Sequence, residues 1–76
     1  MKKQVVEMQI RSKQADLKDM KWMRKHFIDR RAEMRDRKAP TAILSRYDND
    51  LVDVNRKIAL LELEIGDLED RLLARA

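Results

Sequence analysis

Apolar residues in the second half of the chain recur at alternating gaps of three and four positions between residues 44 and 72. This spacing is the heptad pattern abcdefg with apolar residues at a and d, and it is typical of a helix that packs lengthwise against another helix. Nine successive positions fit the pattern and define the C-terminal seam: Leu44, Tyr47, Leu51, Val54, Ile58, Leu61, Ile65, Leu68 and Leu72. We therefore expect a helix at about residues 44–74 that self-associates with other helices through this seam.

The first 38 residues contain neither Gly nor Pro, and they predict another long helix at about residues 3–38. Its a and d positions are apolar at Val6, Ile10, Leu17, Met20, Phe27 and Met34 but basic at Lys13, Arg24, Arg31 and Lys38. This N-terminal seam is therefore weaker than the C-terminal one. Its long basic side chains are expected to lay their methylene groups along the seam while their charges reach water.

The break between the two helices falls at Pro40. Because Pro lacks an amide hydrogen and disfavours the helical conformation at the preceding residue, we expect a turn at about residues 39–43. Either Thr41 or Ser45 could cap the next helix, and Ser45 stands three positions before Asp48, which is the capping-box spacing. Both helices then belong to a single domain, residues 1–76.

Charged residues at the e and g positions beside the seams favour a chain that folds back at Pro40. These positions are mostly acidic in the C-terminal helix and mostly basic in the second half of the N-terminal helix. A hairpin would place Arg31 and Arg35 beside Asp48 and Asp50, and Lys18 and Lys21 near Glu62 and Glu64. The sequence therefore predicts an all-α fold, an antiparallel and coiled-coil-like hairpin of two long helices. A parallel dimer of one long kinked rod is the alternative.

A chain of 76 residues buries little apolar surface, and this one has no Cys for a disulfide or a thiolate metal site. Its composition, 42% charged and 43% hydrophobic, is that of a long-helix protein. We therefore expect self-association into a four-helix bundle or a higher oligomer. No apolar run approaches the ~20 residues of a membrane span, so we expect an intracellular, cytoplasmic protein without a membrane partner.

Further apolar residues recur every seven positions on faces that a hairpin leaves exposed. They run through Met1, Met8, Ala15 and Trp22 on the first helix, and through Val52, Ala59, Gly66 and Leu73, joined by Leu60 and Leu63, on the second. These outer stripes predict a second interface. Gly66 costs roughly 1 kcal/mol relative to Ala inside a helix. Close approach of another backbone would account for it, and a tolerated Gly without a role is the alternative.

The residue types argue against catalysis. His26 has no Cys and no second His as a companion, and with Asp29 it supplies only two of the ligands that a zinc site requires. Gly66 stands alone, so it forms no Gly-rich phosphate loop. We therefore predict a protein that is not an enzyme and that uses neither a metal nor a cofactor.

The basic segment is the sharper functional signal. Residues 1–38 carry thirteen basic and six acidic side chains, a net charge of +7, whereas residues 39–76 carry five and eight, a net charge of −3. Clustered basic side chains around an aromatic residue suit an anionic partner, and the candidates here are Trp22, Arg24, Lys25, Arg30 and Arg37. The alternative is that these cations pair inside the hairpin, as Arg37 would with Glu33.

These features together predict a non-catalytic interaction protein. It would be a self-associating hairpin that docks onto a macromolecular partner, chiefly another protein, and regulates or blocks it. A small basic helical bundle that binds nucleic acid is the first alternative. A protein that sequesters an anionic ligand such as a nucleotide is the second.

Overall fold

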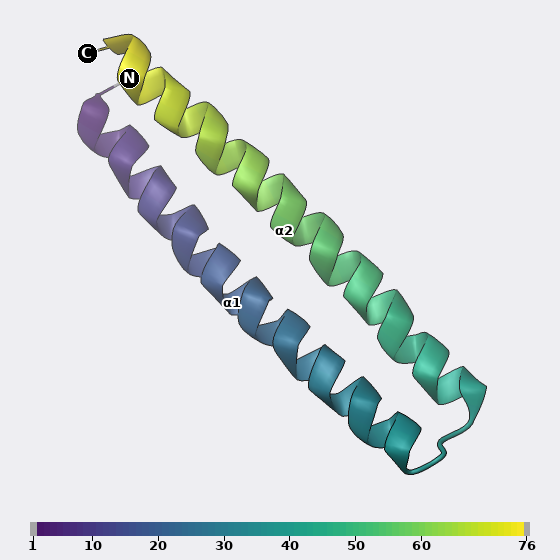
Figure 1. Ribbon diagram of the computed structural model, residues 1–76. Helices are drawn as coiled ribbons and strands as arrows, with labels where there is room; N and C mark the ends of the chain where they lie inside the picture. Colours follow the sequence, from purple (N-terminus) through teal and green to yellow (C-terminus); the bar gives the residue numbers. More distant parts are fainter. Residues whose placement is uncertain (1, 76) are drawn as a thin grey trace.

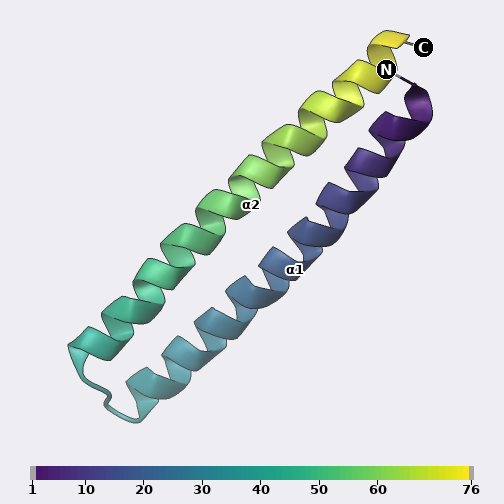
Figure 2. The same ribbon diagram turned by 180° about the vertical axis from the view of Figure 1, so that it is seen from behind.

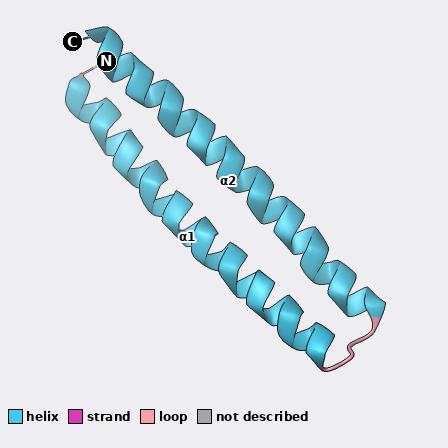
Figure 3. Ribbon diagram, in the orientation of Figure 1, coloured by secondary structure: helices cyan, strands magenta, loops and turns pink. Residues whose placement is uncertain are grey.

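The computed structural model describes residues 2–75 and consists of two long helices, α1 (Lys3–Asp36) and α2 (Thr41–Arg75). The helices lie side by side and run in opposite directions, in the front view and from behind (Figures 1 and 2). Figure 3 shows that the loop joining them is short. The molecule is a rod about 56 Å long and 14 Å wide. The all-α antiparallel hairpin predicted by the heptad pattern is confirmed, and the long kinked rod is wrong.

The core is a single apolar stripe between the two helices. Its buried members are Val6 and Ile10 of α1 and Val54, Ile58, Ile65 and Leu68 of α2. All six occupy a or d positions of the heptads. No polar or charged side chain is buried within the described part of the chain. Burial of such aliphatic side chains, each contributing about 1.5–3 kcal/mol, is the main favourable term that holds α1 against α2.

Packing is tightest at the end of the rod that lies away from the turn. Val6, Ile10, Ile65 and Leu68 form one cluster there, with Leu17 and Leu72 packed against it. Towards the turn the seam residues Phe27, Met34, Leu44, Tyr47 and Leu51 are half-buried. The difference follows from the sequence, because α1 places basic residues at two seam positions in the turn half.

A left-handed residue follows the C-cap of α1, which is Arg37. Lys38 has φ 59°, its amide donates to the carbonyl oxygen of Arg35 (3.0 Å), and the Ala39 amide donates to that of Met34 (2.9 Å). This pair of hydrogen bonds is the Schellman motif, which satisfies carbonyl groups at the end of a helix. Gly usually fills the left-handed position, because a Cβ atom there costs about 1–2 kcal/mol.

The observed turn is shorter than the expected one at residues 39–43. α1 ends at Asp36, two residues before the expected position, and α2 begins at Thr41 instead of residue 44. The carbonyl oxygen of Pro40 accepts hydrogen bonds from the amides of Ile43 (3.0 Å) and Leu44 (3.3 Å). Pro40 therefore stands at the cap position that we expected for Thr41 or Ser45. Pro is tolerated at the entry into a helix, because its fixed φ is compatible with the first turn and no amide hydrogen is needed there.

We predict that Lys38→Gly stabilises the hairpin by about 1 kcal/mol, because Gly adopts the left-handed conformation without a steric penalty. Urea unfolding followed by far-UV circular dichroism measures the change. The matched control is Lys25→Gly, which removes an exposed Lys from the interior of α1 and should destabilise by roughly 1 kcal/mol. Equal destabilisation by both substitutions would contradict the left-handed turn.

Candidate interaction surfaces

The C-terminal seam lies against α1 of the same chain. Four of its nine residues are buried and the other five are half-buried. The apolar a and d residues of α1 are likewise buried or half-buried. The seam therefore serves the contact between the two helices of one hairpin. Its use between chains stays a prediction.

Three pairs of polar residues connect the helices and define how they are aligned. Arg31 Nε donates to Asp48 Oδ1 (2.6 Å), Arg24 Nη1 donates to Asn55 Oδ1 (3.4 Å), and Lys13 Nζ pairs with Glu64 Oε2. The residue numbers of each pair add to 77 or 79, so residues whose numbers add to about 78 lie opposite one another. In this register every a residue of one helix faces a d residue of the other, which is the layer pattern of an antiparallel coiled coil.

The same contacts explain how basic residues are accommodated in the N-terminal seam. In the register just described, Arg31 lies opposite Tyr47, and its partner Asp48 is the next residue along α2. Arg24 lies opposite Val54 and likewise reaches the next residue, Asn55, whereas Lys13 lies opposite Ile65 and reaches the preceding residue, Glu64. Each cation thus stays half-buried over an apolar layer while its charged end reaches an acceptor at the flank of the seam. The sequence predicted the pairing of Arg31 with Asp48, and it is confirmed.

Other predicted pairs are replaced by different ones. Glu64 pairs with Lys13 and not with Lys18 or Lys21, because the register places those two lysines opposite Leu60 and Lys57. Arg35 Nε lies 4.0 Å from Oδ1 of its neighbour Asp36, and Glu33 Oε2 lies 3.6 Å from Nη1 of Arg30 instead of reaching Arg37. The charge pattern predicted the folding back of the chain correctly, but it could not fix the exact alignment of the two helices.

The outer stripes are exposed and lie on different helices, away from the seam. On α1, Met8 and Trp22 are 69% and 67% exposed and Ala15 is also exposed, while Met1 lies outside the described residues. On α2 the exposed members are Val52, Ala59, Leu60, Leu63 and Leu73. A Cβ atom added at Gly66 would contact nothing within 4 Å, apart from its immediate surroundings in the helix. The hairpin by itself therefore gives no reason for this Gly.

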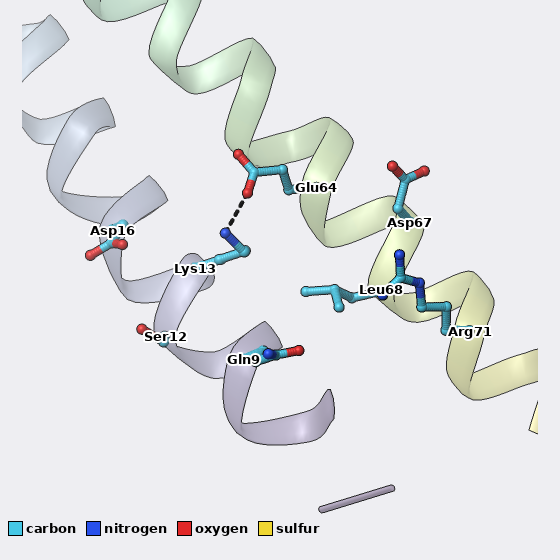
Figure 4. A pocket seen from close by; sticks show the side chains of 8 residues that line it. All are labelled: Gln9, Ser12, Lys13, Asp16, Glu64, Asp67, Leu68 and Arg71. Carbon is cyan, nitrogen blue, oxygen red and sulfur yellow. Dashed lines mark hydrogen bonds and ion pairs between the residues drawn. The ribbon is translucent and has the colours of Figure 1, made fainter. Parts of the chain in front are cut away.

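A shallow groove of about 470 Å³ runs between the helices on one flank of the seam. It is lined by Gln9, Ser12, Lys13 and Asp16 of α1 and by Glu64, Asp67, Leu68 and Arg71 of α2. Figure 4 shows Lys13 and Glu64 joined across it. Three carboxylates and two cations line its walls, so their charges partly cancel. The heptad pattern places four of the eight beside the seams, at g positions: Gln9, Asp16, Glu64 and Arg71. The register shows which of the lining residues meet.

The five candidate residues for an anionic partner do not share one surface. Arg24 lies in the seam and is bonded to Asn55, and Arg30 pairs with Glu33. Trp22 and Lys25, three positions apart, share the outer face of α1 and are exposed. Arg30 and Arg37 stand at g positions, on another flank of α1. The indole of Trp22 stacks on the imidazole of His26, with ring centroids 5.5 Å apart and planes 6° apart.

Positive charge is concentrated in the half of the rod that contains the turn. Residues 21–57 form this half and carry eleven basic and six acidic side chains, a net charge of +5. The remaining residues carry seven basic and eight acidic side chains, a net charge of −1. The hairpin is therefore electrostatically polar along its length.

Among residues 2–75, no three His, Asp or Glu side chains are grouped so that they could hold a metal ion. Neither helix, within those same residues, combines the length and apolar character that crossing a membrane demands. Comparisons with models of protein families, with curated proteins and with solved structures give no match. The surfaces described above are therefore the basis for assigning a function.

We predict that a double-mutant cycle on Arg31→Ala and Asp48→Ala gives a coupling of about 0.2–1 kcal/mol, because the pair is partly exposed and bridges the two helices. The matched control is the cycle on Lys21→Ala and Glu62→Ala, a pair that the register keeps apart, with no expected coupling. Both are measured by chemical unfolding. Coupling in the control cycle as large as in the first would refute the register.

Proposed function

We propose that this chain is a non-catalytic interaction and assembly protein that acts inside the cell. Its hairpin pairs with a second copy and docks onto a macromolecular partner, which it regulates or blocks. The observation that carries this proposal is the outer stripe of α2. Leu63 and Leu73, 63% and 74% exposed, are turned away from the only apolar core of the described chain. Exposed apolar residues aligned along one helix are typical of a binding surface.

The energetics of a two-helix rod support pairing between chains. Six buried side chains make a small core for a chain of this length, and domains of this size are marginally stable. A second hairpin would cover the outer stripe and add a second apolar contact without a change in fold. Assemblies of four helices built from two hairpins are a common solution to this problem.

The face of α1 that remains exposed in such a pair suits a partner of opposite charge. If α2 is covered by a second copy, Trp22 and Lys25 on α1 remain exposed, next to the positive charge of the turn half. Trp is favoured at binding hot spots, because it buries a large area at little entropic cost. We propose that this region of α1 contacts an acidic surface of the partner protein.

We predict a molar mass above the 9.1 kDa of one chain at micromolar concentration, measured by light scattering after size-exclusion chromatography. Leu63→Glu should shift the mass to the monomer, because it introduces a charge into the apolar contact between copies. Met8→Glu makes the same kind of change on α1 and should leave the mass unaltered. A helical monomer at every concentration would contradict the proposed self-association.

A second candidate function is nucleic-acid binding. The stacked Trp22 and His26 rings, with Lys25 nearby on the same helix, favour it, since aromatic side chains and cations together hold single strands. We predict that a plot of the logarithm of the affinity for single-stranded RNA against the logarithm of the salt concentration has a slope of about −0.7 for each phosphate contacted. Lys25→Glu should weaken binding, because it reverses the charge beside the stacked rings, and Arg11→Glu, at another exposed position of α1, is the charge-matched control. A flat salt dependence in filter binding would rule this function out.

A further inference from the structure

A second heptad seam, the α2 outer seam, lies on the side of α2 that faces away from α1. It occupies the b and f positions and consists of Val52, Arg56, Ala59, Leu63, Gly66, Asp70 and Leu73. The gaps between these residues alternate between four and three, which is the spacing of a helix-packing seam. All seven are exposed except Gly66, which is half-exposed. The seam extends over about 32 Å of helix, at ~1.5 Å per residue.

We propose that the α2 outer seam binds the α2 outer seam of a second copy in antiparallel orientation, with Leu63 of each chain seated over Gly66 of the other. This inference rests on the proposed self-association and specifies its geometry. The occupant is a second copy because the seam is complementary to itself, both in shape at its centre and in charge on either side of the centre.

Shape complementarity comes from Leu63 and Gly66. In an antiparallel pair with a two-fold axis midway between these positions, a and d layers place Leu63 of one copy against Gly66 of the other, twice. Gly66 leaves a notch, since a Cβ atom there would meet nothing within 4 Å beyond its immediate surroundings, and Leu63 is a 63% exposed knob one turn away. The close approach of two helices at this notch accounts for a Gly in the middle of a helix.

Charge complementarity comes from Arg56 and Asp70, which stand seven residues on either side of Leu63. Neither forms an ion pair among the side chains that the structure describes. In the antiparallel pair Arg56 lies opposite Leu73 of the second copy, one turn from Asp70 of that copy, so two ion pairs flank the centre. A parallel pair would instead align Arg56 with Arg56 and Asp70 with Asp70, which is repulsive.

The proposed dimer is a row of four helices. The outer seam and the seam that contacts α1 lie on nearly opposite sides of α2, so the two α2 helices form the middle of the row and each α1 stays at an edge. This arrangement leaves the Trp22 face of both α1 helices exposed to a partner. It differs from a compact bundle in which all four helices share one core.

Charge exchange tests the orientation. The dissociation constant of the wild-type dimer is measured by sedimentation equilibrium and compared with those of Arg56→Asp, Asp70→Arg and the double variant. Each single variant should weaken the dimer about tenfold or more, because it places like charges side by side twice, and the double variant should restore it. The matched control is Asp67→Arg, the same charge change three residues from Asp70 but off the seam, which should leave the affinity unaltered.

Gly66→Leu tests the notch. A Cβ atom at this position meets nothing in the single hairpin, and Leu favours the helix more than Gly does, so the monomer should stay helical and be no less stable, while dimer affinity should fall about tenfold or more. This geometry would be wrong if the wild type associates but Gly66→Leu does not weaken the dimer. It would also be wrong if the double charge exchange does not restore the dimer affinity. Self-association itself would stand in both cases. A monomeric wild type would overturn both and leave the α2 outer seam to a different protein.

Discussion

The hairpin depends on one contact, the burial of a narrow apolar stripe on α2 by a partly basic stripe on α1. Unlike the core of a globular domain, this contact lies along a line, so each layer is supported only by its neighbours. Val6, Ile10, Ile65 and Leu68 make the strongest layers, and they lie far from the turn. The turn joins the two helices at the end of the rod where packing is weaker. At the other end the best-packed apolar layers hold the helices together.

The basic seam residues modify this contact without breaking it. Arg24, Arg31 and Lys13 reduce the apolar content of α1, but each reaches an acceptor at the flank of the seam. Individually such contacts contribute little, since hydrogen bonds and ion pairs that remain partly exposed to water are weak. These contacts fix the alignment of the two helices. An apolar seam that repeats every seven residues is compatible with more than one register, whereas directed polar contacts form in only one register.

The sequence predicted what periodicity can encode and missed what depends on backbone detail. The seam could be read directly because burial repeats with the heptad. The alignment could not, since it depends on the length of the turn, and that length is set by the left-handed Lys38 and by Pro40 as a cap. The pattern of α1 continues through Lys38, so nothing in it marks Asp36 as the last helical residue.

The same distinction applies to the surfaces. Periodicity identified the residues of the outer stripes and the helix that carries each stripe, and the described members of both stripes are exposed except Gly66, which is half-exposed. Proximity in sequence suggested that Trp22, Arg24, Lys25, Arg30 and Arg37 act together. The helix separates them, because Arg24 turns into the seam and Arg30 and Arg37 lie on another flank. These residues are close in the sequence, but a binding site requires residues that share one face of the helix.

The uneven charge of the rod has a consequence for how it meets other molecules. A slender body with an excess of +5 at one end and −1 at the other experiences a torque in the field of an anionic surface. It would rotate before contact so that the turn leads, and collisions would begin from a narrow range of orientations. Salt would shorten the reach of this torque to about 8 Å at physiological ionic strength, so pre-alignment would act only over the last part of the approach.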